Sequence, residues 1–257
     1  MIIDADCHIS PTPTGGNSIT VDELLARMDR AGVDKALAWL QPPYLREVSQ
    51  ANRYVAKAMA DHGDRILGFG WADPNLGVPK AIDEARRCID EYGLFGVKLN
   101  GAQNSFYIDD PQLSLPVIEA VAETGKLLAF HVGADAFEQT HPFRVAKIAR
   151  MFPRMPILMV HMGGVGHPDL TNAAIEFAGQ CPNLTLIGSA ARTGAILKAI
   201  RTLGAHRVCF GSDTPFELMH VELARYRALL DGETSPDEQA QVLGRNIARL
   251  FGLDLDG

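Results

Sequence analysis

Eight short apolar runs, spread along 257 residues, constrain the fold of this chain more than any other feature. The runs are rich in Val, Ile, Leu and Phe, which favours β-strands, and longer stretches with helical spacing lie between them. The expected strands are residues 1–5, 35–40, 66–71, 95–100, 127–132, 156–161, 184–189 and 207–212.

The stretches between the runs have the length and periodicity of amphipathic helices, and several end at a glycine, as helix C-termini often do. They include residues 21–32, 45–63, 79–93, 111–125 and 194–204, and two closing helices are expected at 217–230 and 235–253. Strands that alternate with helices pair in parallel, and eight such units close most naturally into a barrel. We therefore predict an α/β fold, a (β/α)8 TIM barrel with additional C-terminal helices, and keep an open doubly wound sheet as the alternative. No Pro-, Gly- or Ser-rich linker interrupts the pattern, so residues 1–257 are expected to form one domain.

Ionisable and polar side chains recur where the expected strands end. In a barrel these C-terminal strand ends surround one pocket, so we expect the side chains to converge there. Because alternate residues of a strand share a face, Asp6 and His8 should point to one side and Cys7 to the other. The residues in question are Asp6, His8, Lys98, Asn100, His131, His161 and Asp213.

Converging carboxylates and imidazoles are the donors that zinc, manganese and iron prefer. A catalytic metal site leaves one position open for water, and zinc lowers the pKa of that water to roughly 7. An acid/base site without metal is the alternative. In that case the buried carboxylates would need other partners or would shift towards the neutral form.

The composition narrows the class of partner. A net charge of −7 argues against electrostatic binding of nucleic acid, which needs clustered Lys and Arg. No apolar stretch reaches the roughly 18 residues of a membrane helix, and no targeting segment is recognised. The four cysteines form no CxxC pair, so we expect reduced thiols and a cytoplasmic protein. A small-molecule substrate is expected, with no nucleic acid or membrane partner, and a homo-oligomer is left open.

Six motifs, in this order and spacing, together resemble the amidohydrolase superfamily, specifically its amidohydrolase-related (amidohydrolase 2) mononuclear branch. The likeness extends from Met1 to about Leu253. The branch includes metal-dependent hydrolases, lactonases, and decarboxylases of the aminocarboxymuconate-semialdehyde and γ-resorcylate type. The motifs are DADCHI at 4–9, FGVKLN at 95–100, FHVG at 130–133, LMVHMGG at 158–164, FGSDTPF at 210–216 and VLGRNIARLFGL at 242–253.

The resemblance implies a distorted (β/α)8 barrel that binds one divalent metal, with zinc expected and manganese as the alternative. The implied ligands are Asp6, His8, His131 and Asp213. His161 would lie beside the metal, where it polarises the substrate or moves a proton.

Two positions depart from the family pattern. Asp6 stands where the first histidine of an HxH pair is usual, and the shorter carboxylate could favour a harder ion such as manganese. Asn100 stands where histidine is frequent, which changes an acid/base role into a positioning role. Lys98 could hold a substrate carboxylate or pair with an internal acid, and Arg192 could bind an anionic substrate from the rim.

From these observations we expect a metal-dependent hydrolase of a small ester, lactone or amide. In this mechanism metal-activated water attacks a carbonyl, Asp213 takes its proton and His161 stabilises the oxyanion. A non-oxidative decarboxylase of a small carboxylic acid is the first alternative. The chain has few insertions from which to build the substrate lids of the longer decarboxylases, which favours hydrolysis. A catalytically inactive binding barrel is the second alternative.

Overall fold

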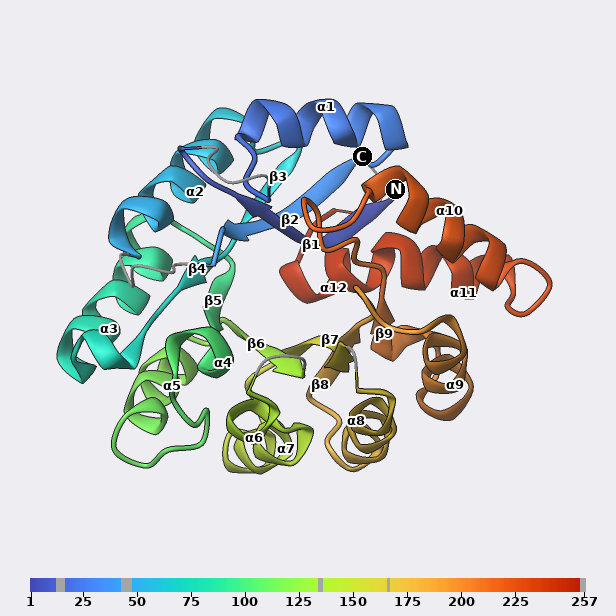
Figure 1. Cartoon of the computed structure of the whole chain (residues 1–257). Helices are drawn as coiled ribbons and strands as arrows, with labels where there is room; N and C mark the ends of the chain where they lie inside the picture. The colour runs from blue at the N-terminus through green and yellow to red at the C-terminus, as the bar shows by residue number, and fades with distance from the viewer. Residues whose placement is uncertain (13–16, 43–47, 134–135, 166, 255–257) are drawn as a thin grey trace.

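Parallel strands surrounded by helices form the (β/α)8 barrel predicted from the sequence (Figure 1). The computed structural model describes residues 1–12, 17–42, 48–133, 136–165 and 167–254. The strands are β1 Ile3–Ile9, β2 Lys35–Leu40, β3 Ile66–Gly68, β4 Gly70–Trp71, β5 Gly96–Leu99, β6 Leu127–Gly133, β7 Ile157–Val165, β8 Leu184–Ile187 and β9 Val208–Cys209.

The two groups of paired strands form one continuous barrel. They are joined through β3 and β4, and the first strand meets the last. β3 pairs with β2 and β4 pairs with β5, so these two segments are parts of one strand interrupted at Phe69. The circle closes between β1 and the segment that follows β9. There the Ala5 N–H donates to the Phe210 carbonyl at 3.0 Å, and the His8 N–H donates to the Thr214 carbonyl at 2.7 Å.

Most of the helices lie outside the strands, as a barrel requires, whereas α12 packs against the inner core (Figure 1). The first helix illustrates the local signals: Thr20 and Glu23 form a capping box at its start, and Gly32 ends it with a φ of 71°. The helix predicted over 45–63 is α2, and residues 45–47 of that prediction lie outside the described residues. The helices are α1 Val21–Ala31, α2 Ser49–Asp61, α3 Val78–Arg86, α4 Gly101–Asn104, α5 Ser114–Glu123, α6 Phe137–Thr140, α7 Pro142–Met151, α8 Pro168–Gln180, α9 Thr193–Leu203, α10 Met219–Leu230, α11 Pro236–Ala240 and α12 Asn246–Phe251.

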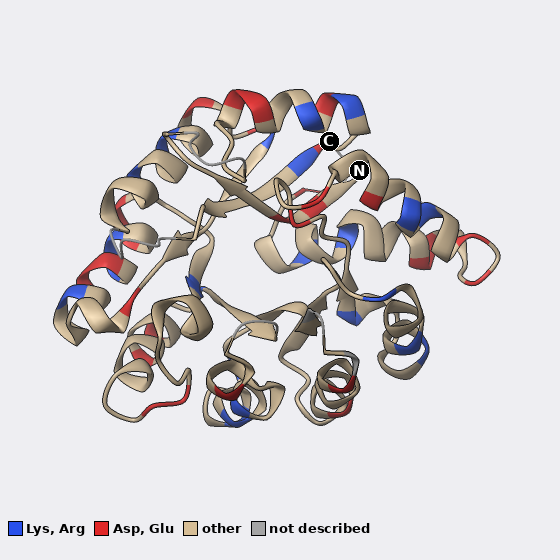
Figure 2. Ribbon diagram, viewed as in Figure 1, with Lys and Arg blue, Asp and Glu red and all other residues tan. Residues whose placement is uncertain are grey.

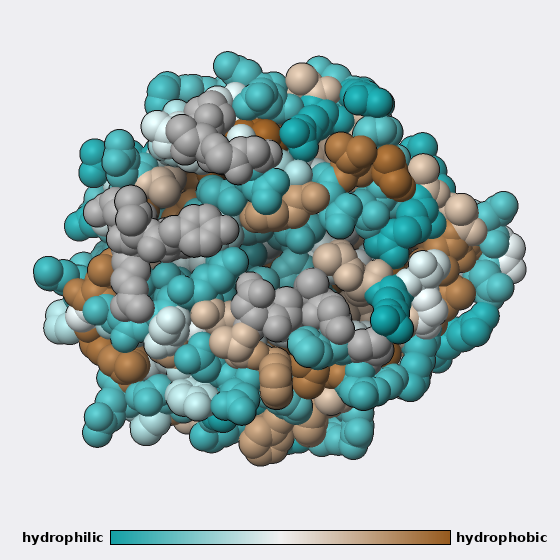
Figure 3. Space-filling model, viewed as in Figure 1, coloured by the Kyte–Doolittle hydropathy of each residue, from teal (hydrophilic) through white to brown (hydrophobic). Residues whose placement is uncertain are grey.

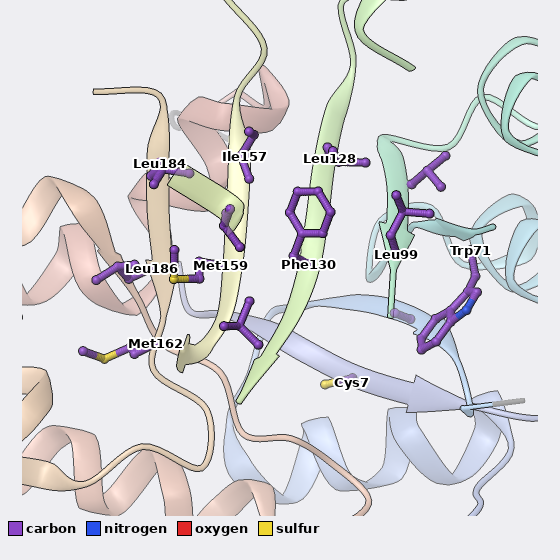
Figure 4. Packing of buried hydrophobic residues seen from close by; sticks show 14 of the residues in the cluster. Cys7, Trp71, Leu99, Leu128, Phe130, Ile157, Met159, Met162, Leu184 and Leu186 are labelled. Atoms are coloured by element: carbon purple, nitrogen blue, oxygen red, sulfur yellow. The ribbon is translucent and has the colours of Figure 1, made fainter. Parts of the chain in front are cut away.

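Alternate residues of the strands build two separate cores. One set packs outward against the helices, and Figure 4 shows part of it, including Phe130, Met159 and Leu186 on neighbouring strands. The other set fills the inside of the barrel, where Phe251 of α12 packs with it. The inward set comprises Ile3, Ala5, Leu37, Trp39, Leu67, Phe69, Leu127, Ala129, Leu158, Val160, Ile187 and Cys209.

A bulge in β1 changes which residues face inward. Between Asp4 and Cys7 the pairing with β2 shifts, so that β1 carries one extra residue. Ile3, before the bulge, belongs to the inner core, and Cys7, after it, belongs to the outer core. Asp6 and His8 consequently face the inside. They lie within β1, which runs to Ile9 and is longer than the strand predicted over residues 1–5.

Charged residues lie mainly on the helices around the barrel (Figure 2), and the face shown in Figure 3 is largely hydrophilic. None of the helices in the described ranges has the length and apolar character needed to cross a membrane. Because most charged residues lie on the outer helices, the charged groups buried inside the barrel need a specific explanation.

We predict that Phe251→Ala destabilises the fold by about 3–5 kcal/mol, the usual loss for truncating a buried phenylalanine. Phe251 is 8% exposed and stacks on Phe95 with ring centroids 4.7 Å apart. Urea denaturation of the variant measures the loss. Met151→Ala, which truncates a side chain that is 48% exposed, is the matched control and should change stability by less than about 0.5 kcal/mol. Equal losses in the two variants would contradict the assignment of Phe251 to the inner core.

Candidate functional site

Asp6 and His8 bring a carboxylate and an imidazole to the inside of β1. Both side chains are buried, and His8 Nε2 lies 3.6 Å from Asp6 Oδ1 and 3.7 Å from Asp213 Oδ1. His8 Nδ1 lies 2.9 Å from the Leu40 carbonyl, which can only accept a hydrogen bond. The Nδ1 nitrogen of a neutral His8 therefore carries the hydrogen, and Nε2 carries the lone pair, which accepts a hydrogen bond from Trp39 Nε1 at 3.1 Å.

His131 on β6 and His161 on β7 are in direct contact. His161 Nε2 lies 3.2 Å from His131 Nδ1, and the two rings are nearly perpendicular. His161 has a φ of 60°, a backbone conformation that side chains rarely adopt. On its other edge, His161 Nδ1 lies 3.8 Å from Asp6 Oδ2. The pair therefore joins the ends of two strands to the carboxylate on β1.

Asp213 follows β9 and also has a positive φ, of 61°. Its side chain is 14% exposed, whereas those of Asp6, His8 and His161 are 0–4% exposed. Asp213 is therefore the acid of this cluster that is most accessible to a ligand.

Lys98 on β5 is a fully buried lysine. Its Nζ lies 3.5 Å from the centroid of the Trp39 ring and 5.4 Å from that of Trp71, which allows cation–π attraction. The ammonium is also 3.9 Å from Asp6 Oδ1 and has no hydrogen-bond partner among the described residues. Of the two roles expected for Lys98, this placement matches the pairing with an internal acid.

Burial and charge act against each other on the ionisable groups. Burial alone would raise the pKa of Asp6, but the charges of Lys98 and the neighbouring histidines bring that pKa below its usual range. Burial lowers the pKa of Lys98 to about 8, although the acids oppose that shift. Burial and the charge of Asp6 raise the pKa of Asp213 well above its usual range.

His8 and His131 remain neutral because burial and nearby positive charge lower their pKa values. Burial and then the charge of Lys98 lower the pKa of His8 to about 3. Burial and then the charge of His161 lower the pKa of His131 well below its usual range. Neutral imidazoles offer a lone pair, which is the form that binds a metal ion.

Two residues predicted to bind substrate lie outside this set of contacts. Asn100 caps α4: its Oδ1 accepts a hydrogen bond from the Gln103 N–H at 3.0 Å, and its Nδ2 donates to Gln103 Oε1 at 2.8 Å. Arg192 is exposed at the start of α9 and forms no ion pair within the described part of the chain. The substrate-binding roles of both residues stay predictions.

Sequence reasoning missed three neighbours of the site. Ser189 follows β8, and its hydroxyl donates to Asp6 Oδ2 and lies 3.0 Å from His161 Nδ1. Trp39 contacts both His8 and Lys98, and Asp4 accepts the N–H of Asp6 at 3.1 Å. Ser189 ends an expected strand, so the rule that selected the other polar strand ends would have found it. Asp4 belongs to the DADCHI motif, although no role was assigned to it, and Trp39 carries no signal of this kind.

The donor atoms fit a divalent metal ion. Asp6 Oδ1 and His131 Nε2 are buried and have no hydrogen-bond partner among the described residues, which is costly unless a ligand compensates. One ligand atom each from Asp6, His161 and Asp213 lies within 4.8 Å of the others. This grouping includes His161, whereas the resemblance implies His8 and His131, and both sets share the two carboxylates.

Comparison with known proteins gives one family and several named relatives. A family model described as Amidohydrolase matches residues 3–253. The chain is 26% identical over 255 residues to a 2-amino-3-carboxymuconate-6-semialdehyde decarboxylase of Dictyostelium discoideum, with 84% of this chain and 69% of that protein covered. It is 25% identical over 291 residues to a γ-resorcylate decarboxylase of Rhizobium sp. (strain MTP-10005), with 91% and 87% covered.

A solved structure has the same fold. It is a dihydroxybenzoic acid decarboxylase from Polaromonas sp. JS666 with bound manganese and the inhibitor 2-nitroresorcinol. The TM-score is 0.77 at 20% sequence identity, and 98% of this chain and 96% of that one are covered. At this identity the likeness concerns the fold alone.

These comparisons correct the expected reaction. The sequence favoured hydrolysis of an ester, lactone or amide, and this is contradicted because the relatives and the solved structure are named as decarboxylases. The expectation rested on the shortness of the chain and on metal donors that can serve either reaction. Fold and donors do not determine which bond is broken.

Three observations point to the same family over nearly the whole chain: the six motifs, the barrel fold and the family match. The match over residues 3–253 shows that this protein belongs to the amidohydrolase family.

Proposed function

We propose that this protein is a metal-dependent, non-oxidative decarboxylase of a small carboxylic acid. The observation that carries the proposal is the buried cluster of two acids, three histidines and one lysine in which Asp6 Oδ1 and His131 Nε2 lack partners among the described residues. The names of the relatives support decarboxylation over the other reactions that such donors can serve.

In this proposal Asp6, His8, His131 and Asp213 hold one divalent ion. The ion, when bound, would supply positive charge that attracts the oxygens of an acidic substrate and holds the substrate in place. An aspartate in place of histidine adds a hard oxygen donor, so we expect manganese to be preferred to zinc. The manganese in the related Polaromonas structure supports this choice.

The residues of the chain then have separate tasks. Asp213, the most accessible acid of the cluster, donates a proton to the carbon that carries the carboxylate, and a new C–H bond forms. The C–CO2 bond breaks next, its electron pair returns to the adjacent unsaturated system, and carbon dioxide leaves. Asp213 regains a proton from solvent. This chemistry requires a substrate whose carboxylate is attached to a double bond or an aromatic ring.

Charge balance and substrate binding complete the assignment. Lys98, whose ammonium is fully buried against Trp39, offsets the negative charge of Asp6 and Asp213. His161 lies between His131 and Asp6 and keeps both in place. Arg192 can bind the carboxylate of an incoming substrate from the rim.

The proposal predicts carbon dioxide release from unsaturated or aromatic carboxylic acids by the manganese-loaded protein. A panel of such acids, assayed for carbon dioxide, is compared with a matched panel of esters, lactones and amides, assayed for released acid. Chelation should abolish the activity and added Mn2+ should restore it better than Zn2+. Release of acid from esters or amides, with no carbon dioxide from any carboxylic acid, would overturn the proposal.

Asp213→Asn should lower turnover on the order of 100-fold or more, the usual contribution of a positioned acid or base. The amide keeps the size of the side chain but cannot donate a carboxyl proton. The measurement is carbon dioxide release at saturating Mn2+, with metal content determined in the same samples. Near-normal turnover with metal bound would exclude Asp213 as the proton donor and make His161 the better candidate.

His131→Ala should weaken Mn2+ binding far more than His161→Ala does. The first substitution removes the unpaired Nε2 atom, whereas the second removes a ring that bonds to His131 and lies beside Asp6. Isothermal titration of both metal-free variants ranks the affinities, and His161→Ala should mainly slow turnover. The opposite ranking would assign His161 to the metal, as the grouping of His161 with the two acids suggests.

A further inference from the structure

Ser189 lies between two parts of the proposed centre that come from different strands, β1 and β7. It follows β8, is fully buried, and its hydroxyl donates to Asp6 Oδ2 on β1. The same oxygen is 3.0 Å from His161 Nδ1 on β7. The backbone carbonyl of Ser189 lies 3.2 Å from that nitrogen. One residue thus contacts two side chains that arrive on different strands.

These contacts fix where the hydrogens lie. A backbone carbonyl can only accept, so His161 Nδ1 carries a hydrogen and, in a neutral ring, Nε2 carries the lone pair. His131 Nδ1, at 3.2 Å from that lone pair, must then donate to it. The remaining nitrogen of His131, Nε2, is left with a lone pair and has no partner among the described residues.

The same chain of hydrogen bonds orients Asp6. Since Ser189 takes Oδ2, the other carboxylate oxygen is left as the available donor, and Oδ1 is the one that lies near His8 Nε2 and Lys98 Nζ. Among the described residues, Oδ1 has no hydrogen-bond partner. An aspartate side chain can rotate, whereas hydrogen bonding to a fixed hydroxyl limits that rotation.

The packing beside Ser189 shows that β1 and the end of β8 approach each other closely. Gly211 follows β9 and has no side chain. A Cβ added at this position would lie 3.1 Å from Asp6 Cβ and 3.2 Å from Ser189 Cβ. The same Cβ would be 2.6 Å from the side chain of Ile187, which cannot be accommodated without a shift. The absence of a side chain at Gly211 therefore lets β1 and the end of β8 approach each other.

We infer that Ser189 is a positioning residue that joins Asp6 to the His161–His131 pair and thereby presents Asp6 Oδ1 and His131 Nε2 as the two free donor atoms for a divalent metal ion. The inference rests on the proposed function. It adds a residue that neither the motifs nor the comparisons assign. Ser189 does not touch the ion. It acts through the side chains that it holds.

Substitution of Ser189 by alanine tests the inference. Ser189→Ala should weaken Mn2+ binding by about 10-fold or more, the usual effect of removing a residue that orients a metal ligand. Ser114→Ala is the matched control: Ser114 is equally buried and donates one hydrogen bond, to the Tyr107 carbonyl at 2.6 Å, on a helix outside the cluster. Both variants lose a buried hydroxyl, so both should lose similar stability, and only Ser189→Ala should lose metal affinity.

Isothermal titration of metal-free proteins with MnCl2 measures the affinities, and thermal unfolding measures the stabilities. Equal Mn2+ affinity in the wild type and Ser189→Ala would overturn the inference and leave the proposed function intact. A wild-type protein that binds neither Mn2+ nor Zn2+ would overturn the proposed metal site, and the inference with it.

A second measurement needs no metal. Long-range 1H–15N spectra of the metal-free wild type should show His131 and His161 both protonated at Nδ1 and both unprotonated at Nε2. The spectra of His131→Ala and His161→Ala assign the signals. A hydrogen on Nε2 of either ring would contradict the order of donors on which the inference depends.

Discussion

The site depends on how the barrel closes. β1 meets the segment after β9 through two backbone hydrogen bonds, from Ala5 to Phe210 and from His8 to Thr214. The carboxylate of Asp4 strengthens this junction, because its Oδ1 accepts the N–H of Ser212 at 2.8 Å and also the N–H of Asp6. The first and last strands thereby bring Asp6 next to Asp213.

The closed junction places several acids in a region of low polarity. Burial raises the pKa of Asp4 to about 7, and the same effect acts on Asp213. Lys98 provides one buried positive charge nearby, and it has lost most of its contact with water. Two acids and the neutral imidazoles of His8 and His131 around unpaired donor atoms make the cluster suited to a divalent cation, whose charge would complete the balance.

The sequence predicts the barrel and the residues that meet inside it because both follow from local patterns. Short apolar runs define the strands, and polar residues such as His131 and Asp213 at their ends mark the working face. The bulge in β1 could not be predicted, because it depends on pairing with β2 and on the junction with β9. The pairing of Asn100 with Gln103 likewise depends on the start of a short helix that the apolar periodicity did not indicate.

The sequence patterns could not predict the reaction, for a different reason. Hydrolysis and decarboxylation can use the same metal donors, and the difference lies in how the substrate is oriented against them. The position of Ser189 was visible in the sequence, but its contacts with Asp6 and His161 were not, because they join three strands that are far apart along the chain.

The most direct test of the account is a crystal structure of the protein grown with MnCl2, with anomalous diffraction data collected at the manganese edge. The account predicts one anomalous peak inside the barrel, about 2.0–2.3 Å from Asp6 Oδ1, His8 Nε2, His131 Nε2 and a carboxylate oxygen of Asp213. Binding at His8 requires the Trp39 N–H to move off Nε2. The account would be contradicted if the barrel held no anomalous peak, or if the manganese were bound by His161 and lay far from His131.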